Sequence, residues 1–240
     1  MVYEITDENE IKLLHFSNLP FDENDINSCE GTDSFRPVEV LLSGLNRPGE
    51  RHGTKYTYTA PGYRLKYKDM KDYRNETGRK LEILMEDKPT GLEVCSNIQF
   101  YDGISVIRSW TELKNNGEED LGVEYVSSFA LLGIDKEGLL STDEKLEVLI
   151  ARNAWQKELI WNRFSMDQLG MSISQPDKVR RSSQTISVGN TGNWSTKNYL
   201  PMGCLKNKET DSILFWQIEQ NGSWYWEISD QDGHMYLQLS

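Results

Sequence analysis

Hydrophobic and polar residues alternate along most of the chain, a pattern typical of β-strands with one buried face. In the segment 104–113, Arg108 and Trp110 fall on one side of the predicted strand, and Ser109 and Thr111 fall on the other. The runs 81–87 and 92–101 are separated by Lys-Pro-Thr-Gly, which is a turn sequence. They predict a hairpin within a meander of antiparallel strands.

Other segments extend this all-β pattern. Residues 56–59 and the following nine residues alternate around the pair Pro61-Gly62, which predicts two strands with a turn between them. Helical periodicity is weak. The best candidate is 143–164, where Leu146, Leu149 and Ile150 have helical spacing, although Leu-Glu-Val-Leu-Ile also suits a strand. Both interpretations stay open, and we expect few short helices overall.

Three of the seven tryptophans, Trp216, Trp224 and Trp226, cluster near the end of the chain. The runs 213–219 and 224–229 flank Asn221-Gly222, a pair that tolerates the positive φ of tight turns, and they predict a hairpin. Trp224 and Trp226 fall on one face of the second run. Aromatic residues usually bury, so we expect a core hairpin, with a sugar-stacking platform as the alternative. The final run, 234–240, alternates and predicts a further strand.

Composition narrows the classes of protein. The 240 residues are 37% hydrophobic and 27% charged, as in a globular chain. Lys and Arg number 26 against 38 Asp and Glu, a net charge of −12, which argues against nucleic acid and anionic membranes as partners. Neither a signal peptide nor a run of ~20 apolar residues is present. The widely spaced Cys29, Cys95 and Cys204 indicate reduced thiols, so we expect a cytoplasmic protein.

Motifs for catalysis or metal binding are missing. The three histidines, His15, His52 and His234, lie far apart, and the sequence has neither a nucleophile elbow nor a phosphate-binding glycine loop with its lysine. The many acidic residues single out no pair at a glycosidase spacing. We therefore predict no catalytic residue, no metal site and no cofactor.

One polar loop offers a candidate binding site. The segment Asn-Thr-Gly-Asn-Trp-Ser-Thr-Lys-Asn-Tyr-Leu-Pro-Met-Gly, residues 190–203, holds Trp194 and Tyr199 among small polar residues. Indole rings pack against the C–H faces of sugars, and amides bond to their hydroxyls. Trp194, Asn193 and Tyr199 are therefore candidate contacts for a sugar or for an interface, with a structural loop as the alternative.

These segments resemble the N-terminal region of glycoside hydrolase family 36 α-galactosidases. The resemblance rests on runs that occur in the same order in that family: 36–40, 52–56, 91–94, 99–103, 108–113, 124–131, 190–203, 215–230 and 236–240. It implies a large antiparallel β-supersandwich, similar to galactose mutarotase. In the family this sandwich precedes a (β/α)8 barrel that cleaves terminal α-linked galactose from melibiose or raffinose. The barrel's aspartates are the nucleophile and the acid/base of this retaining reaction.

For this chain the resemblance implies one non-catalytic domain over 1–240, which ends before the barrel and before the last strands of the sandwich. The family's Lys-Trp-Asp nucleophile motif has no counterpart here, so no catalytic residue is carried over. The implied partners are the barrel of the same polypeptide, other subunits of a tetramer, and galactosides. The domain would support folding and assembly, and Trp194 would shape substrate access. A stand-alone carbohydrate-binding module and an aldose epimerase-like enzyme using His and Glu are the alternatives.

Overall fold

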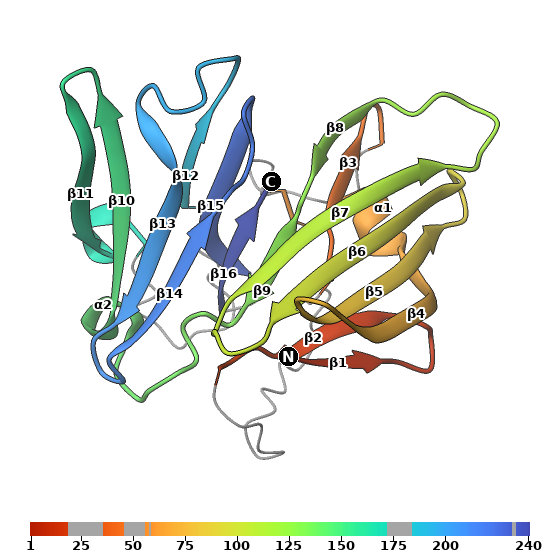
Figure 1. The fold of residues 1–240 in the computed structure, drawn as a ribbon, viewed down its shortest axis with the longest axis horizontal. Coiled ribbons are helices and arrows are strands. Elements are labelled where there is room, and N and C mark those ends of the chain that lie inside the picture. Colours follow the sequence, from red (N-terminus) through yellow and green to blue (C-terminus); the bar gives the residue numbers. More distant parts are fainter. Residues whose placement is uncertain (19–35, 46–55, 58, 172–183, 232–233) are drawn as a thin grey trace. The chain divides into compact units, whose positions relative to one another are not determined.

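The computed structural model describes residues 1–18, 36–45, 56–57, 59–171, 184–231 and 234–240 (Figure 1). The chain divides into two compact units, Met1–Leu131 (unit 1) and Leu132–Ser240 (unit 2). Strands make up 56% of the described residues and helices 6%, so the predicted all-β class with few short helices is confirmed. No helix in these ranges is long and apolar enough to cross a membrane. The single domain over 1–240 stays a prediction.

Unit 1 contains three antiparallel sheets. The first pairs β1 (Val2–Ile5) with β2 (Ile11–His15), and the second pairs β3 (Val40–Leu42) with β8 (Val123–Val126). The third is a meander in the order β4 (Lys66–Asn75), β5 (Gly78–Asp87), β6 (Leu92–Tyr101) and β7 (Ile107–Asn115). The predicted hairpin of 81–87 and 92–101 is confirmed as β5 and β6.

One face of the meander packs on the core of unit 1. Ile83 and Met85 of β5 and Val94 of β6 are fully buried there, beside Val40 of β3. Alternate positions on the same strands face away from this core, as the period of two requires.

The predicted turn at Pro61-Gly62 lies instead inside the short helix α1 (Ala60–Arg64), and the strand expected after it begins at Lys66, in β4. Of the strand expected over 56–59, the described residues 56, 57 and 59 are not part of a strand. Pro61 stands in the first turn of α1, where a missing N–H is tolerated. A Cβ on Gly62 would lie 2.4 Å from Thr59 Oγ1 and 2.5 Å from Glu39 Oε2. The Thr59 hydroxyl donates to the same Glu39 oxygen, so Gly62 is needed for close packing rather than for a strand-to-strand turn.

Unit 2 consists mainly of two antiparallel sheets. The helix α2 (Thr142–Lys145) leads into a sheet in the order β11 (Lys157–Ser165), β10 (Leu146–Ala154), β13 (Tyr199–Asn207) and β14 (Ser212–Gln217). The other sheet has the order β12 (Thr185–Asn190), β15 (Trp224–Gln231) and β16 (His234–Leu239), with β9 (Phe129–Leu132) at its edge. The division between the units falls in β9. A 3₁₀ turn, η2 (Asp167–Leu169), follows β11.

The ambiguous segment 143–164 is mostly strand. Only its first residues continue α2, where Ser141 and Glu144 form a capping box. The rest is the hairpin of β10 and β11, in which Val148 and Ile150 point into the core and Leu149 points outward. Strand alternation, rather than the helical spacing of its leucines, was the correct signal.

The predicted hairpin around Asn221-Gly222 is wrong. β14 pairs with β13, whereas β15 pairs with β12 and β16, so the chain crosses from one sheet to the other between residues 217 and 224. Neither Asn221 nor Gly222 has a positive φ. A sheet-to-sheet connection does not require the twisted turn of a hairpin, which explains the error.

The clustered tryptophans lie between these two sheets. Trp216 of β14 meets Trp226 of β15 edge to face, with ring centroids 5.2 Å apart. Both rings are buried, and so is Trp224. On β13, Gly203 lies opposite Trp216 and leaves room for the indole. The core interpretation of these residues is therefore confirmed, while their pairing is corrected.

The reverse face of β15 and β16 is also buried, although it is polar. The carboxylate of Glu227 accepts hydrogen bonds from Tyr225 Oη at 2.7 Å and from Tyr236 Oη at 2.8 Å. Burial, followed by the nearby Glu227 charge, raises the pKa of Tyr236 well above its usual value. The Tyr236 hydroxyl therefore remains a donor to Glu227 at neutral pH.

The close packing of Trp216 against Gly203 can be tested by substitution. A Cβ at this position would lie 2.4 Å from Trp216 Cζ2, and the ring cannot retreat because Trp226 packs against it. We expect Gly203→Ala to lower the free energy of unfolding by about 1–3 kcal/mol in urea denaturation. Gly222→Ala is the matched control, because nothing lies within 4 Å of its Cβ. Equal effects of the two substitutions would contradict this packing.

An ion-pair cluster in unit 1 predicts a pH dependence. Glu10 Oε1 accepts contacts of 2.9 Å from both Arg36 Nη2 and Lys66 Nζ. Hydrogen bonding from Arg36 is the main cause that lowers the pKa of Glu10 to about 2. A lowered pKa in the folded state means that this stabilisation is present above about pH 4.5 and is lost as the pH falls through about 2.

We therefore expect Glu10→Gln to lower the free energy of unfolding by about 1 kcal/mol at pH 7. The difference from the native chain should shrink between about pH 4.5 and pH 2. Urea denaturation across this range measures it, with exposed Glu118→Gln as the control. A difference that stays constant with pH would contradict the assignment.

Candidate functional site

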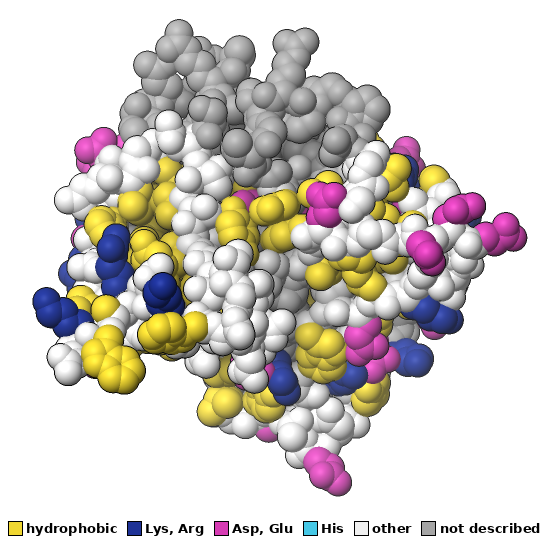
Figure 2. Space-filling model, turned by 90° about the horizontal axis from the view of Figure 1, so that it is seen from above, with side chains coloured by type: hydrophobic (Ala, Val, Ile, Leu, Met, Phe, Trp, Pro, Cys, Tyr) yellow, Lys and Arg dark blue, Asp and Glu magenta, His cyan; other side chains and the backbone are white. Residues whose placement is uncertain are grey.

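The exposed tryptophans of the described chain all belong to unit 2. Trp155 and Trp194 are 80% and 55% exposed, and Trp161 is exposed to a smaller degree. Large indole rings in solvent are uncommon in isolated soluble domains and often mark a binding surface. Trp194 comes from the loop between β12 and β13, and Trp155 comes from the turn of the β10–β11 hairpin. Figure 2 shows hydrophobic and basic side chains side by side on this end of unit 2.

The loop that presents Trp194 is anchored from the core. Trp224 Nε1 donates a hydrogen bond of 2.6 Å to the carbonyl of Ser195, the next residue in the loop. The Gly192 N–H donates to Ser223 Oγ at 3.1 Å, just before β15. A buried indole thus holds the backbone next to an exposed one, which limits the positions that Trp194 can occupy.

Asn153 joins this loop to the end of β10. Its Nδ2 donates to the Thr196 carbonyl at 2.6 Å, and its backbone N–H donates to the Asn198 carbonyl at 3.0 Å. On the other side, Asn153 Oδ1 accepts from the Leu159 N–H of β11. One side chain therefore brings the turn with Trp155 and the loop with Trp194 to the same end of unit 2.

Basic side chains lie among these rings. The Arg152 guanidinium is 5.3 Å from the ring centroid of Tyr199, which is opposite it in the β10–β13 register. The Lys197 ammonium is 6.0 Å from the Trp194 ring centroid. Such cation–π contacts align flat aromatic faces with hydrogen-bond donors. We call the set Arg152, Trp155, Trp194, Lys197 and Tyr199 the aromatic end of unit 2.

This surface offers stacking rings and donor groups. A sugar ring can pack on an indole while its hydroxyls accept hydrogen bonds from guanidinium or ammonium groups. A protein surface with carbonyl and carboxylate groups would use the same donors. The arrangement suits a sugar or a protein surface, and binding either of them requires no catalytic residue in this chain.

The sequence-based candidates fall in this region. Trp194 and Asn193 are exposed neighbours in the loop, and Tyr199 is half-buried where β13 begins. Their binding role stays a prediction. The sequence analysis did not identify Trp155 and Arg152 as candidate contacts, because it left the segment 143–164 open between helix and strand. No Gly or Pro occurs in residues 151–158, so the sequence carries no strong local signal for this hairpin turn.

Reactive side chains elsewhere do not form a metal cluster in the described part of the chain. No group of three or more His, Cys, Asp and Glu side chains there could hold a metal ion. Cys95 and Cys204 are free thiols, and burial is the main cause that raises the pKa of each. Cys29 and His52 lie outside the described residues.

Comparisons with known proteins show which solved structures share this fold. No family model matches the sequence, and no curated protein matches it. Among solved structures, the chain is similar to a family 36 α-galactosidase from Geobacillus stearothermophilus in complex with raffinose. That match has a TM-score of 0.69 and 17% identity, and covers 99% of this chain and 35% of the other.

Two further structures agree. An α-galactosidase from Lactobacillus brevis matches with a TM-score of 0.64 at 13% identity, over 99% of this chain and 34% of its own. The galactosidase domain of an α-galactosidase–sucrose kinase has a TM-score of 0.63 at 16% identity, over 99% and 35% of the two chains. At these identities the similarity establishes the fold. The chain spans about a third of the length of the structures that it matches.

The bridging role of Asn153 can be tested directly. Asn153→Ala removes the hydrogen bond to Thr196 and the acceptor for Leu159. We expect faster amide hydrogen exchange across 191–198 and a loss of about 1 kcal/mol in the free energy of unfolding. Asn162→Ala, on β11 opposite Ile150, is the matched control. If both variants changed exchange in the loop equally, Asn153 would not hold it.

Proposed function

We propose that the chain is the N-terminal β-supersandwich domain of a family 36 α-galactosidase. The main support is a fold similarity that covers 99% of this chain but only 35% of the Geobacillus enzyme. The ordered sequence resemblance, from residues 36–40 to 236–240, is in keeping with this proposal. In this proposal, terminal α-linked galactose is removed from oligosaccharides such as melibiose and raffinose by a retaining barrel in the rest of the polypeptide.

The domain itself has a non-catalytic role. It supports folding of the barrel, contributes to a homo-tetramer and shapes access to the substrate. The cytoplasm is the proposed compartment, in keeping with reduced thiols and an oligosaccharide substrate taken up by the cell. The catalytic aspartates belong to the barrel, and no residue of this chain is assigned to bond cleavage.

The aromatic end of unit 2 is the proposed point of contact. Trp194, with Asn193 and Tyr199, would lie at an interface with the barrel or with another subunit, on the side where sugar enters. The exposed rings of Trp155 and Trp194 favour this assignment, because burying them in an interface stabilises a complex. The anchoring of the loop by Trp224 and Asn153 supports it as well, since a preorganised loop loses less entropy on binding.

A stand-alone carbohydrate-binding module is the alternative. An exposed Trp194 favours it, whereas the buried Trp224 and Trp226 do not. The two functions differ in what the 240 residues do alone. A module binds sugar by itself with an affinity that depends on Trp194, whereas an assembly domain needs the barrel to complete the site.

The test compares the longer polypeptide, carrying the barrel, with its Trp194→Ala variant. We expect the variant to raise KM for raffinose or melibiose about tenfold, or to weaken the tetramer, because a central aromatic contact is removed. Steady-state hydrolysis and sedimentation velocity measure these effects. The isolated 240 residues should hydrolyse no p-nitrophenyl α-galactoside.

Two control variants accompany the Trp194→Ala comparison. Trp194→Phe keeps an aromatic ring and should have a smaller effect, while Val106→Ala, at an exposed apolar position of unit 1, should behave as the native enzyme. Unchanged KM and unchanged oligomer size in Trp194→Ala would refute the contact. Hydrolysis by the isolated chain would refute the non-catalytic role.

A further inference from the structure

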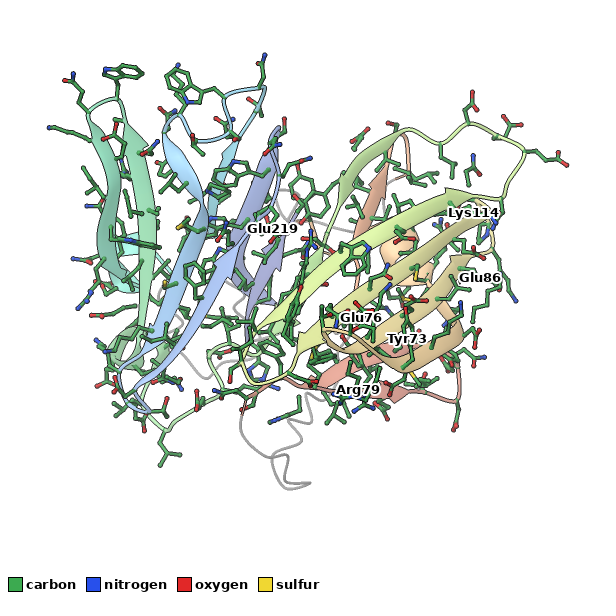
Figure 3. The ribbon with its side chains drawn as sticks, in the orientation of Figure 1. Tyr73, Glu76, Arg79, Glu86, Lys114 and Glu219 are labelled. Atoms are coloured by element: carbon green, nitrogen blue, oxygen red, sulfur yellow. The ribbon has the colours of Figure 1, made fainter. Side chains whose placement is uncertain are left out.

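The outward face of the meander in unit 1 carries an ordered set of polar and aromatic side chains. We call this set the polar face. It consists of Lys71 and Tyr73 on β4, Lys80 and Glu82 on β5, Asn97 and Gln99 on β6, and Arg108, Trp110 and Glu112 on β7. The registers align Lys71, Glu82, Asn97 and Trp110 in one row across the four strands. Figure 3 labels Tyr73 on this sheet.

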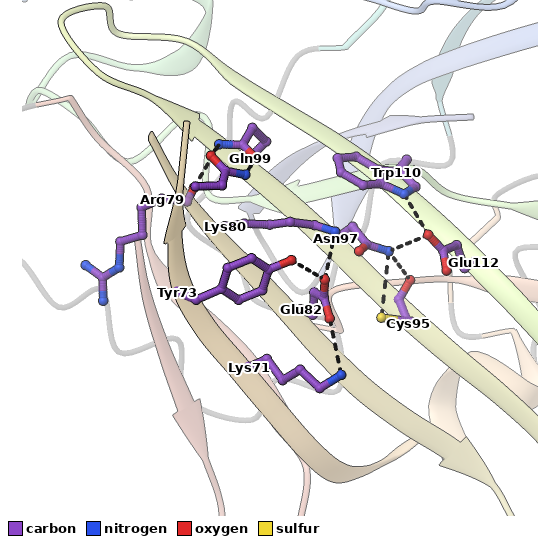
Figure 4. Close-up of polar contacts among 11 residues, drawn as sticks. Lys71, Tyr73, Arg79, Lys80, Glu82, Cys95, Asn97, Gln99, Trp110 and Glu112 are labelled. Carbon is purple, nitrogen blue, oxygen red and sulfur yellow. Dashed lines mark hydrogen bonds and ion pairs between the residues drawn. The ribbon is translucent and has the colours of Figure 1, made fainter. Parts of the chain in front are cut away.

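Glu82 is the centre of one half of the polar face (Figure 4). Its Oε1 accepts from Tyr73 Oη at 2.7 Å and from Lys80 Nζ at 2.7 Å. Lys71 Nζ lies 3.8 Å from the other oxygen. The hydrogen bonds from Lys80 and then Tyr73 are the main causes that lower the pKa of Glu82, so the carboxylate is charged at neutral pH.

Trp110 is held in the other half. Its Nε1 donates to Glu112 Oε1 at 2.9 Å, and Asn97 Nδ2 donates to the same oxygen at 3.3 Å. The Lys80 ammonium lies 4.9 Å from the Trp110 ring centroid. Lys80 thus connects the two halves, and the orientation of the indole is fixed from its polar edge (Figure 4).

The face has a buried floor and an accessible rim. Asn97 is 2% exposed, and Gln99 is also buried, bonding reciprocally with Asn75. Tyr73 is 41% exposed, and the Lys71 side chain is 70% exposed. A ligand would therefore meet aromatic and charged groups whose geometry is already set before it binds.

The charges of this face indicate the class of its ligand. Lys71 and Lys80 both have Glu82 as a partner, so the face offers little surplus positive charge to an anionic polymer. Its centre is charged and hydrogen-bonded, unlike the apolar centre of a typical protein interface. A neutral polyhydroxyl ligand suits it better, because each hydroxyl both donates to a carboxylate and accepts from an ammonium or amide.

We propose that the polar face of unit 1 binds a neutral oligosaccharide. One pyranose ring stacks on Trp110, where it replaces the Lys80 ammonium over the indole. Lys80 keeps its contact with Glu82 and bonds to the sugar hydroxyls. The buried Asn97 holds Glu112, the partner of the Trp110 indole, from below. This inference concerns unit 1 alone and does not rest on the proposed function, which involves unit 2 and a separate barrel.

The test is calorimetric titration of the 240-residue chain with raffinose and with maltotriose. We expect at least one of these probes to bind with a dissociation constant of about 1 mM, in the range of a small stacked contact. Trp110→Ala should weaken that binding at least about tenfold. Phe215→Ala, at an exposed aromatic of β14, is the matched control and should bind as the native chain does.

Two more conservative variants keep the experiment decisive if Trp110→Ala does not fold. Trp110→Phe keeps a stacking ring without its N–H, and Glu82→Gln keeps the shape while removing the charge. Both should unfold at close to the native temperature and bind at least about threefold more weakly. Binding equal to that of the native chain in both folded variants would refute the proposed contacts.

Other outcomes also decide the question. No heat and no saturation-transfer signal with either sugar up to about 50 mM would overturn the proposal. Binding that is lost in Trp194→Ala but kept in Trp110→Ala would overturn it too, while supporting a sugar contact at the aromatic end of unit 2.

The kind of ligand is tested in the same way. Tighter binding of an oligogalacturonate than of raffinose would contradict the proposal that the ligand is a neutral oligosaccharide. Self-association abolished by Trp110→Ala, without sugar binding, would identify a second copy as the occupant.

Discussion

The packing of Trp216 against Trp226 is the constraint on which unit 2 depends. These indoles come from different sheets and meet edge to face at 5.2 Å, so they fix how closely the two sheets approach. The contact exists only because β13 has Gly203 where any side chain would occupy the volume of the Trp216 ring. Aromatic pairs of this kind contribute about 0.5–1.5 kcal/mol beyond the area that they bury.

The same core determines the surface. Trp224 lies two residues before Trp226 and shares its face of β15, which brings its Nε1 to the carbonyl of Ser195. The position of the exposed Trp194 therefore follows from the register of a buried strand. Asn153 then links that loop to the β10–β11 hairpin. Packing in the centre of the sandwich is thus transmitted through two hydrogen bonds to the candidate site.

The sequence predicted the strands better than their pairing. Alternation located β5, β6 and β16 and the inward face of Trp224 and Trp226, because side-chain period is a local property. Sheet membership is not local. Asn221-Gly222 has the composition of a hairpin turn, yet the packing of Trp216 on Trp226 places the two strands in opposite sheets. For the site, the sequence identified Trp194 within its loop but could not show that Trp155 lies in a hairpin turn at the same end of unit 2.

The polar face of unit 1 shows the limit of alternation as a functional signal. Lys80, Glu82 and Trp110 occupy positions that a strand presents outward, and taken singly they describe a solvated surface. Only the antiparallel register brings the row from Lys71 to Trp110 together across four strands. Their hydrogen bonds satisfy most of the charges internally, which reduces the attraction for charged partners and leaves rigid rings with adjacent donors and acceptors. Specific chemistry on this sheet thus arises from strand pairing rather than from any short motif.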